Sequence, residues 1–159
     1  MINCLRIEQK DRPRFSADIL VMCLGNPLRG DDIFGLLVFR LLRKLRVPAL
    51  YAGATPENVV QLLRKVRPKL IIVVDALLGV DEGLFIVRLS DEQSLLPSSH
   101  SLPLKLLIQS SELDPERIIV IGAGAKEISI GSRPNEKIWD LAIEAASIIV
   151  RLLERRSLP

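Results

Sequence analysis

Residues 17–24 read ADILVMCL, a short and nearly continuous apolar run that stops at Gly25, Asn26 and Pro27. This length and this stop predict a buried strand. The next segment, residues 31–46, begins with acids, ends with bases and has apolar residues at helical spacing. Those apolar residues are Phe34, Leu37, Val38, Leu41, Leu42 and Leu45. A strand should therefore lead into a helix whose end charges match its dipole.

The alternation of strand and helix continues along the chain. We expect strands at residues 49–53, 70–74, 84–89 and 117–121, with residues 128–130 as a candidate edge piece. We expect helices at about residues 55–67, 103–108 and 135–156, and a loop at residues 91–99.

This order of elements predicts an α/β fold, because strands that alternate with helices form right-handed crossovers in a parallel sheet. We expect a three-layer sandwich with a mostly parallel sheet of five or six strands and helices on both faces. The 159 residues suit a single domain, with residues 1–14 as a candidate N-terminal arm. Sites in such folds form outside the carboxyl ends of the strands, here residues 25–32, 76–79 and 122–124.

Composition argues against several classes of partner. The net charge is only +3, from 22 basic and 19 acidic residues, and aromatic residues make up 4% of the chain. Nucleic-acid binding is therefore not expected. No apolar stretch approaches the roughly 18 residues that span a bilayer, and residues 1–14 are too polar for a signal peptide. We expect no membrane partner and a cytoplasmic location. Cys4 and Cys23 form no CxxC motif, so Cys23 is expected to pack as a small apolar residue.

The loop at residues 25–32 does not match a phosphate-binding loop. It lacks GxGxxG and Gly-Lys-Ser/Thr, and it places Asp31 and Asp32 at the start of the predicted helix. One reading is structural, with Asp31 capping the helix and Asp32 favouring its dipole. The other is functional, with one carboxylate turned inward as a metal ligand or proton acceptor.

Two further residues could contribute to chemistry. Asp75 directly follows the apolar run at residues 70–74, where a carboxylate is costly unless it is paired, hydrogen-bonded or metal-bound. His100 is the chain's only histidine. A loop-capping role for Asp75 and a surface position for His100 are the structural alternatives. Together, Asp32, Asp75 and His100 would make a nitrogen and oxygen set suited to a divalent transition metal.

Four motifs carry a resemblance to a known family. They are LGNPLRGDD at residues 24–32, PEN at 56–58, IVVDA at 72–76 and SHSLPL at 99–104. In this order and at these spacings, the chain resembles the nickel–iron hydrogenase maturation endopeptidases, most closely the type that serves formate-hydrogenlyase-like hydrogenases. The resemblance covers roughly residues 17–155.

The resemblance implies a fold and an activity. The family has an α/β sandwich, and its members remove a C-terminal extension from the precursor of the hydrogenase large subunit after nickel insertion. That precursor is the implied partner. The nickel is expected to arrive with the substrate, and occupancy of the site by another divalent metal is left open. The implied nickel contacts are Asp32, Asp75 and His100.

The motif at residues 24–32 and the residue that follows it also receive supporting roles. Gly25, Asn26 and Asp31 are expected to support the site, and Ile33 to contact substrate. Ile33 stands where the family usually has glycine, and residues 122–126 read GAGAK where the family often has Gly-Ile-Glu-Pro. Because a β-branched residue avoids positive φ, Ile33 should have ordinary helical φ, with the helix beginning at or just before Asp32. Its side chain should pack on the sheet or, as we favour, stand in the substrate approach.

Two other functions were weighed. Peptidyl-tRNA hydrolases also have a Leu-Gly-Asn-Pro strand end, but they continue with a Thr-Arg-His-Asn segment that this chain lacks. A non-catalytic hydrogenase-maturation chaperone of the same fold is left open by Ile33. The protease that the resemblance implies is favoured. Its chemistry is plausible because a divalent metal can polarise a peptide carbonyl and activate water, and the chain has no convincing Ser-His-Asp or Cys-His set to do this otherwise.

Overall fold

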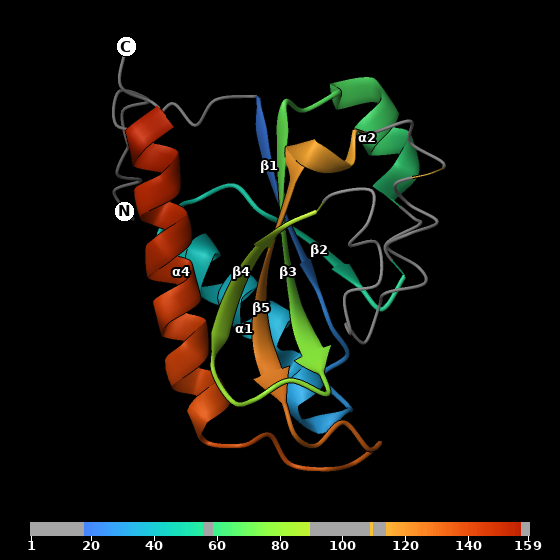
Figure 1. Cartoon of the computed structure of the whole chain (residues 1–159), viewed down its shortest axis with the longest axis vertical. Helices are drawn as coiled ribbons and strands as arrows, with labels where there is room; N and C mark the ends of the chain where they lie inside the picture. The colour runs from blue at the N-terminus through green and yellow to red at the C-terminus, as the bar shows by residue number, and fades with distance from the viewer. Residues whose placement is uncertain (1–17, 56–58, 90–108, 110–113, 157–159) are drawn as a thin grey trace, which may run out of the picture.

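The computed structural model describes residues 18–55, 59–89, 109 and 114–156. Strands and helices alternate along most of this part of the chain (Figure 1). The strands are β1 (Ile19–Leu24), β2 (Leu50–Gly53), β3 (Leu70–Leu78), β4 (Leu84–Arg88) and β5 (Ile118–Ala125). The α-helices are α1 (Phe34–Lys44), α2 (Val60–Val66) and α4 (Lys137–Arg156), and the 3₁₀ turns are η2 (Gly30–Ile33) and η5 (Pro115–Arg117).

The five strands form one sheet in the order β2-β1-β3-β5-β4. Every neighbouring pair is parallel except β4 with β5, which is antiparallel. The carboxyl ends of β1, β3 and β5 therefore point the same way (Figure 1). This confirms the predicted mostly parallel sheet and places the loops that follow these strands at one edge.

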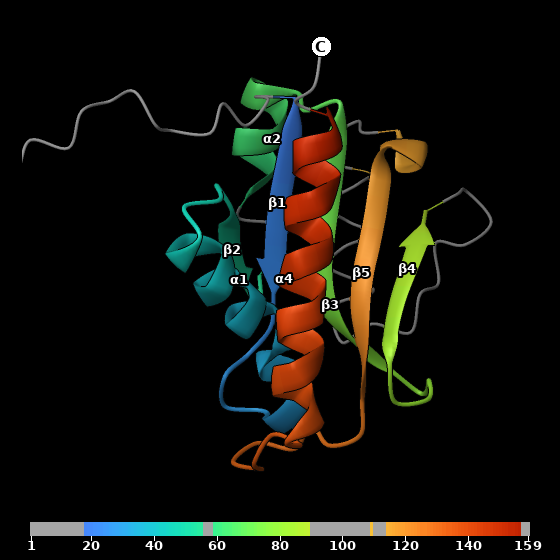
Figure 2. The same cartoon turned by 90° about the vertical axis from the view of Figure 1, so that its left-hand side faces the viewer.

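Helices cover both faces of the sheet, as predicted. On one face, α1 and α4 bury the larger core, which includes Val21, Cys23, Ile72 and Val74 from the strands. On the other face, Val59 and Leu63 at α2 pack on a smaller core. Figure 2 shows α4 running along the sheet. Successive side chains of β1 and β3 point to opposite faces of the sheet, and those in the two cores are apolar because helices cover both faces.

Cys23 lies fully buried in the larger core. Burial raises the pKa of its thiol far above the ordinary value, so the thiol stays protonated. The prediction that Cys23 packs as a small apolar residue is confirmed. Cys4 lies outside the described residues.

Several element boundaries differ from the predictions. Strand β3 continues past Asp75 to Leu78, and β5 continues past Ile121 to Ala125. The two strands pair along this whole extension, so pairing continues where the aspartate and the glycines had suggested an end. Residues 128–130 are not a strand, which makes the candidate edge piece wrong. The predicted features at residues 91–99 and 103–108 lie outside the described residues.

In the part of the chain that the structure describes, no helix has both the length and the apolar character to cross a bilayer.

Candidate active site

The site begins with the tight turn that follows β1. Gly25 has φ of +141°, and a Cβ added to it would lie 2.1 Å from the main-chain oxygen of Asp32. Only glycine allows this close approach in this backbone conformation. The Gly25 N–H donates to the Gly53 carbonyl of β2 at 2.9 Å. The turn is therefore fastened to the neighbouring strand before the chain enters η2.

Asp32 lies fully buried in η2. The Asn26 N–H lies 3.1 Å from both the main-chain oxygen and the carboxylate Oδ2 of Asp32, and it donates to both. Close packing also fixes the first turn of α1 against the end of β1, since a Cβ on Gly35 would lie 1.8 Å from the Leu24 carbonyl oxygen. The supporting roles predicted for Gly25 and Asn26 thus have a geometric basis, because both hold the backbone around Asp32.

Asp75 is fully buried within β3 rather than at its end. Pairing of Cys23 with Val74 puts Asp75 level with Leu24, the last residue of β1. Its Oδ1 accepts the N–H of Ala76 at 2.9 Å. By strand alternation its side chain faces the same side as Ile71 and Val73, the α2 side.

Asp32 and Asp75 therefore lie at the same edge of the sheet. Asp75 is level with the end of β1, and η2, which carries Asp32, contacts β3. His100 lies outside the described residues. Within the described part of the chain, no three His, Cys, Asp or Glu side chains are grouped so as to hold a metal ion. The two acids supply oxygen donors of the kind that divalent metals accept, and the predicted set needs His100 to complete it.

Asp31 faces a different partner, the segment that connects β5 to α4. Its Oδ2 accepts the N–H groups of Lys126 at 2.8 Å and Glu127 at 3.2 Å, and its Oδ1 accepts the Asn135 N–H at 2.6 Å. It makes no side-chain cap on η2, so the structural reading of Asp31 as the cap of its own helix is wrong. Its carboxylate fastens the β1–η2 turn to the approach to α4.

Ile33 has φ of −68° and ψ of −13°, which confirms its predicted right-handed backbone. The first turn is 3₁₀ and begins at Gly30, and the α-helix proper begins at Phe34. The side chain of Ile33 is half-buried and packs against the larger core. The buried part of the side chain thus packs on the core rather than standing in the substrate approach, which was the favoured expectation. A contact between Ile33 and substrate stays a prediction.

Tyr51 of β2 is a site neighbour that sequence reasoning missed. Its hydroxyl donates to the Gly25 carbonyl at 2.6 Å. Burial and the nearby negative charge of Asp32 raise the pKa of Tyr51 above its ordinary value, and Arg40 opposes this in part. The one available signal was its position near the end of a strand predicted to precede a helix.

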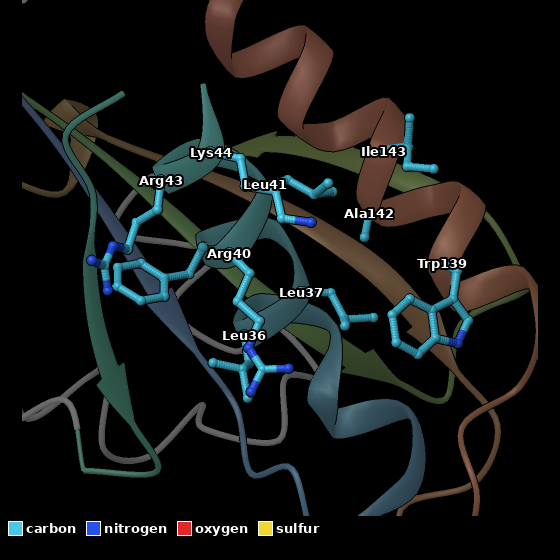
Figure 3. A pocket seen from close by; sticks show the side chains of 10 residues that line it. Leu36, Leu37, Arg40, Leu41, Arg43, Lys44, Trp139, Ala142 and Ile143 are labelled. Atoms are coloured by element: carbon cyan, nitrogen blue, oxygen red, sulfur yellow. The ribbon is translucent and has the colours of Figure 1, made fainter. Parts of the chain in front are cut away.

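A separate groove of about 720 Å³ lies between α1 and α4. Figure 3 shows Trp139 and Ile143 of α4 on one side and Leu37 and Leu41 of α1 on the other. Its lining contains neither Asp32 nor Asp75. The groove is therefore distinct from the candidate active site.

Comparison with known proteins decides the family. No protein-family model matches the chain. A Methanocaldococcus jannaschii protein named "Putative hydrogenase maturation protease MJ0253" is 30% identical over 122 residues, which cover 71% of this chain and 79% of that protein. The chain belongs to the hydrogenase maturation protease family. It is accordingly a protease, a peptide-bond hydrolase.

Two further relatives agree with this assignment. The hydrogenase 3 maturation protease of Escherichia coli K12 is 28% identical over 111 residues, which cover 65% of this chain and 70% of that protein. The crystal structure of the NiFe hydrogenase maturation protease HycI from Thermococcus kodakarensis superposes with a TM-score of 0.69 at 27% identity. That match covers 87% of this chain and 93% of the other. These names favour the protease over the non-catalytic chaperone.

Proposed function

We propose that this hydrogenase maturation protease removes the C-terminal extension from the precursor of a nickel–iron hydrogenase large subunit. The nickel belongs to the substrate, and Asp32, Asp75 and His100 contact it during cleavage. The observation that carries the proposal is the burial of Asp32 and Asp75 at one edge of the sheet. Two carboxylates buried at the same edge favour a cation between them, because nearby positive charge offsets the cost of burying negative charge.

Each protein group has a distinct part in this proposal. The oxygens of Asp32 and Asp75 and the imidazole of His100 would contact the metal that the substrate carries. When present, a divalent metal polarises a peptide carbonyl and lowers the pKa of bound water. Asn26 holds the Asp32 carboxylate in place through its N–H, and Asp31 holds the turn that carries both residues. Preformed geometry of this kind reduces the reorganisation needed when substrate binds.

A substrate that brings the metal makes the cleavage a checkpoint. A precursor without nickel would lack the ion that the two acids are proposed to contact, so it would keep its extension. The same logic predicts negligible cleavage of unrelated proteins, with or without added nickel. Specificity then comes from a folded, metal-loaded partner. The family assignment supports the maturation step, and the pair of buried acids supports the metal-facing site.

The test is a processing assay with the full chain and a purified hydrogenase large-subunit precursor. Matched samples of nickel-loaded precursor, nickel-free precursor and casein are followed by mass spectrometry. We expect one cut, in the nickel-loaded precursor alone. Equal cleavage of the nickel-free precursor would contradict the checkpoint, and efficient digestion of casein would contradict the specificity.

A further inference from the structure

Tyr51 and Asp32 are connected through a single peptide group. The Tyr51 hydroxyl donates to the Gly25 carbonyl at 2.6 Å. The same peptide carries the Asn26 N–H, which donates to Asp32 Oδ2 at 3.1 Å. The path from phenol to carboxylate therefore contains two hydrogen bonds and one planar amide. No other tyrosine occurs in the chain.

This arrangement affects the strength of the contact with Asp32. A hydrogen bond to a peptide oxygen polarises the amide and makes its N–H a better donor, by roughly 10–30% per bond. The ordinary tyrosine pKa of about 10 already keeps the phenol protonated near neutral pH, so it remains a donor. The Asn26 N–H should therefore hold the Asp32 carboxylate more firmly than an amide without this partner.

The arrangement also affects position. Gly25 has positive φ and no side chain, so the turn relies on its hydrogen bonds for a fixed conformation. Strand β2 supplies two of them, since the Gly53 carbonyl accepts the Gly25 N–H and the Tyr51 hydroxyl donates to the Gly25 carbonyl. Both polar groups of Gly25 are thus held by one neighbouring strand. Loss of the hydroxyl would release one of these two constraints.

The aromatic ring of Tyr51 has its own support. It stacks on Phe39 of α1 with ring centroids 5.7 Å apart and an interplanar angle of 30°. The Arg43 guanidinium lies 5.8 Å from the centre of the Phe39 ring. The ring contact and the hydroxyl contact use different parts of Tyr51. They can therefore be removed one at a time.

We propose that Tyr51 is a positioning residue, whose hydroxyl fixes the Asp32 carboxylate through the Gly25–Asn26 peptide. The expected effect of the Tyr51 hydroxyl on processing rests on the proposed function of Asp32. Its expected effect on the position of the Asp32 carboxylate does not depend on that function. In this inference Tyr51 acts on Asp32 through this peptide.

The experiment compares Tyr51→Phe with Phe39→Leu as a matched control. Tyr51→Phe keeps the stacked ring and removes the hydroxyl, whereas Phe39→Leu keeps the hydroxyl and removes the stacked ring. The first readout is NMR of the full chain without substrate, with the Asn26 amide and the Asp32 carboxyl carbon assigned. The second readout is kcat and KM for processing of nickel-loaded precursor.

We expect Tyr51→Phe to shift both resonances, to speed exchange of the Asn26 amide proton and to lower kcat roughly tenfold with little change in KM. This is the lower end of the range for residues that orient a metal ligand. Phe39→Leu should lower the melting temperature and leave both resonances and kcat near their original values. Unchanged resonances in Tyr51→Phe, or equal changes in both variants, would overturn the inference.

The two readouts separate this inference from the proposed function. If the unmodified protein does not process the precursor, the proposed function fails, and the NMR comparison still decides whether Tyr51 positions Asp32. If the resonances shift in Tyr51→Phe but kcat stays unchanged in an active protein, the positioning role in processing is rejected.

Discussion

Asp31 and Asp32 are adjacent and equally buried, yet they face two different regions of the molecule. Asp31 is 1% exposed and Asp32 0%, so burial does not distinguish them. Asp31 uses both carboxylate oxygens to hold three main-chain N–H groups of the β5–α4 connection. Asp32 lies beside the end of β1, in the turn that contacts β3. Asp31 therefore holds the connection to α4, whereas Asp32 is the acid that we propose contacts the metal of the substrate.

The largest expected effect concerns the three residues that we propose contact the metal. Alanine at Asp32, Asp75 or His100 should abolish processing of nickel-loaded precursor, because each change removes a proposed metal contact. The fold should survive, since replacing a buried carboxylate also removes its desolvation cost. A processing assay beside a thermal melt measures both. Normal cleavage by all three folded variants would reject the assignment.

Asp31 should show the opposite pattern, with a large effect on stability. Asp31→Ala leaves three main-chain N–H groups without their acceptor, and we expect a loss of about 3 kcal/mol in the free energy of unfolding. Urea unfolding measures the loss. Glu144→Ala is a matched control, because Glu144 is exposed on α4 beyond its first turn and should change stability by less than about 0.5 kcal/mol. Equal stability of the two variants would show that Asp31 does not hold the frame.

Ile33, which follows the two acids, should have a smaller effect. Ile33→Gly removes the half-buried contact with the larger core and places a flexible residue beside the first turn of α1. We expect a loss of about 1 kcal/mol in stability and a changed preference between precursors. Competition between two nickel-loaded precursors measures the preference. An unchanged ratio would remove Ile33 from substrate recognition.

The smallest effect is expected at Glu82, which supports the same frame as Asp31. Ion pairs with Lys126 and Lys137 lower the pKa of Glu82. A lowered carboxylate pKa stabilises the folded state at pH values above the ordinary pKa of 4.5. This stabilisation is lost as the pH falls through the lowered pKa. The unmodified protein should therefore melt slightly above Glu82→Gln at pH 7, and the difference should shrink on acidification. A constant difference across this range would contradict the ion-pair role.

Much of the fold follows from local sequence patterns. Strand β1 lies within the predicted run, and the amphipathic segment after it forms η2 and α1, because burial on a covered sheet requires these periodicities. The ends of β3 and β5 could not be predicted in the same way. Gly122 and Gly124 suggested an end, but they allow close contact with the Leu77 side chain and the Asp81 main chain. Only the pairing between β3 and β5 shows that both strands continue past these positions.

Only part of the arrangement of the candidate site could be expected from local sequence. Asp32 and Asp75 were proposed from their positions beside buried strands. The register sets Asp75 level with the end of β1, and the contact of η2 with β3 places Asp32 at the same edge. The role of Asp31 depends on groups 95 to 104 residues away in sequence, so no local pattern contains it. Tyr51 likewise acts on a turn 26 residues earlier. Contacts of this length arise only when the sheet has formed.

The most direct test compares Asp31→Asn with Asp32→Asn in cleavage of nickel-loaded precursor. Both changes replace a carboxylate with a group of nearly the same shape, and the assay is run at a temperature where melts show each variant to be folded. We predict that Asp31→Asn retains most of the cleavage rate despite a lower melting temperature, and that Asp32→Asn loses it despite a stable fold. An active Asp32→Asn beside an inactive, folded Asp31→Asn would contradict the division between the two acids.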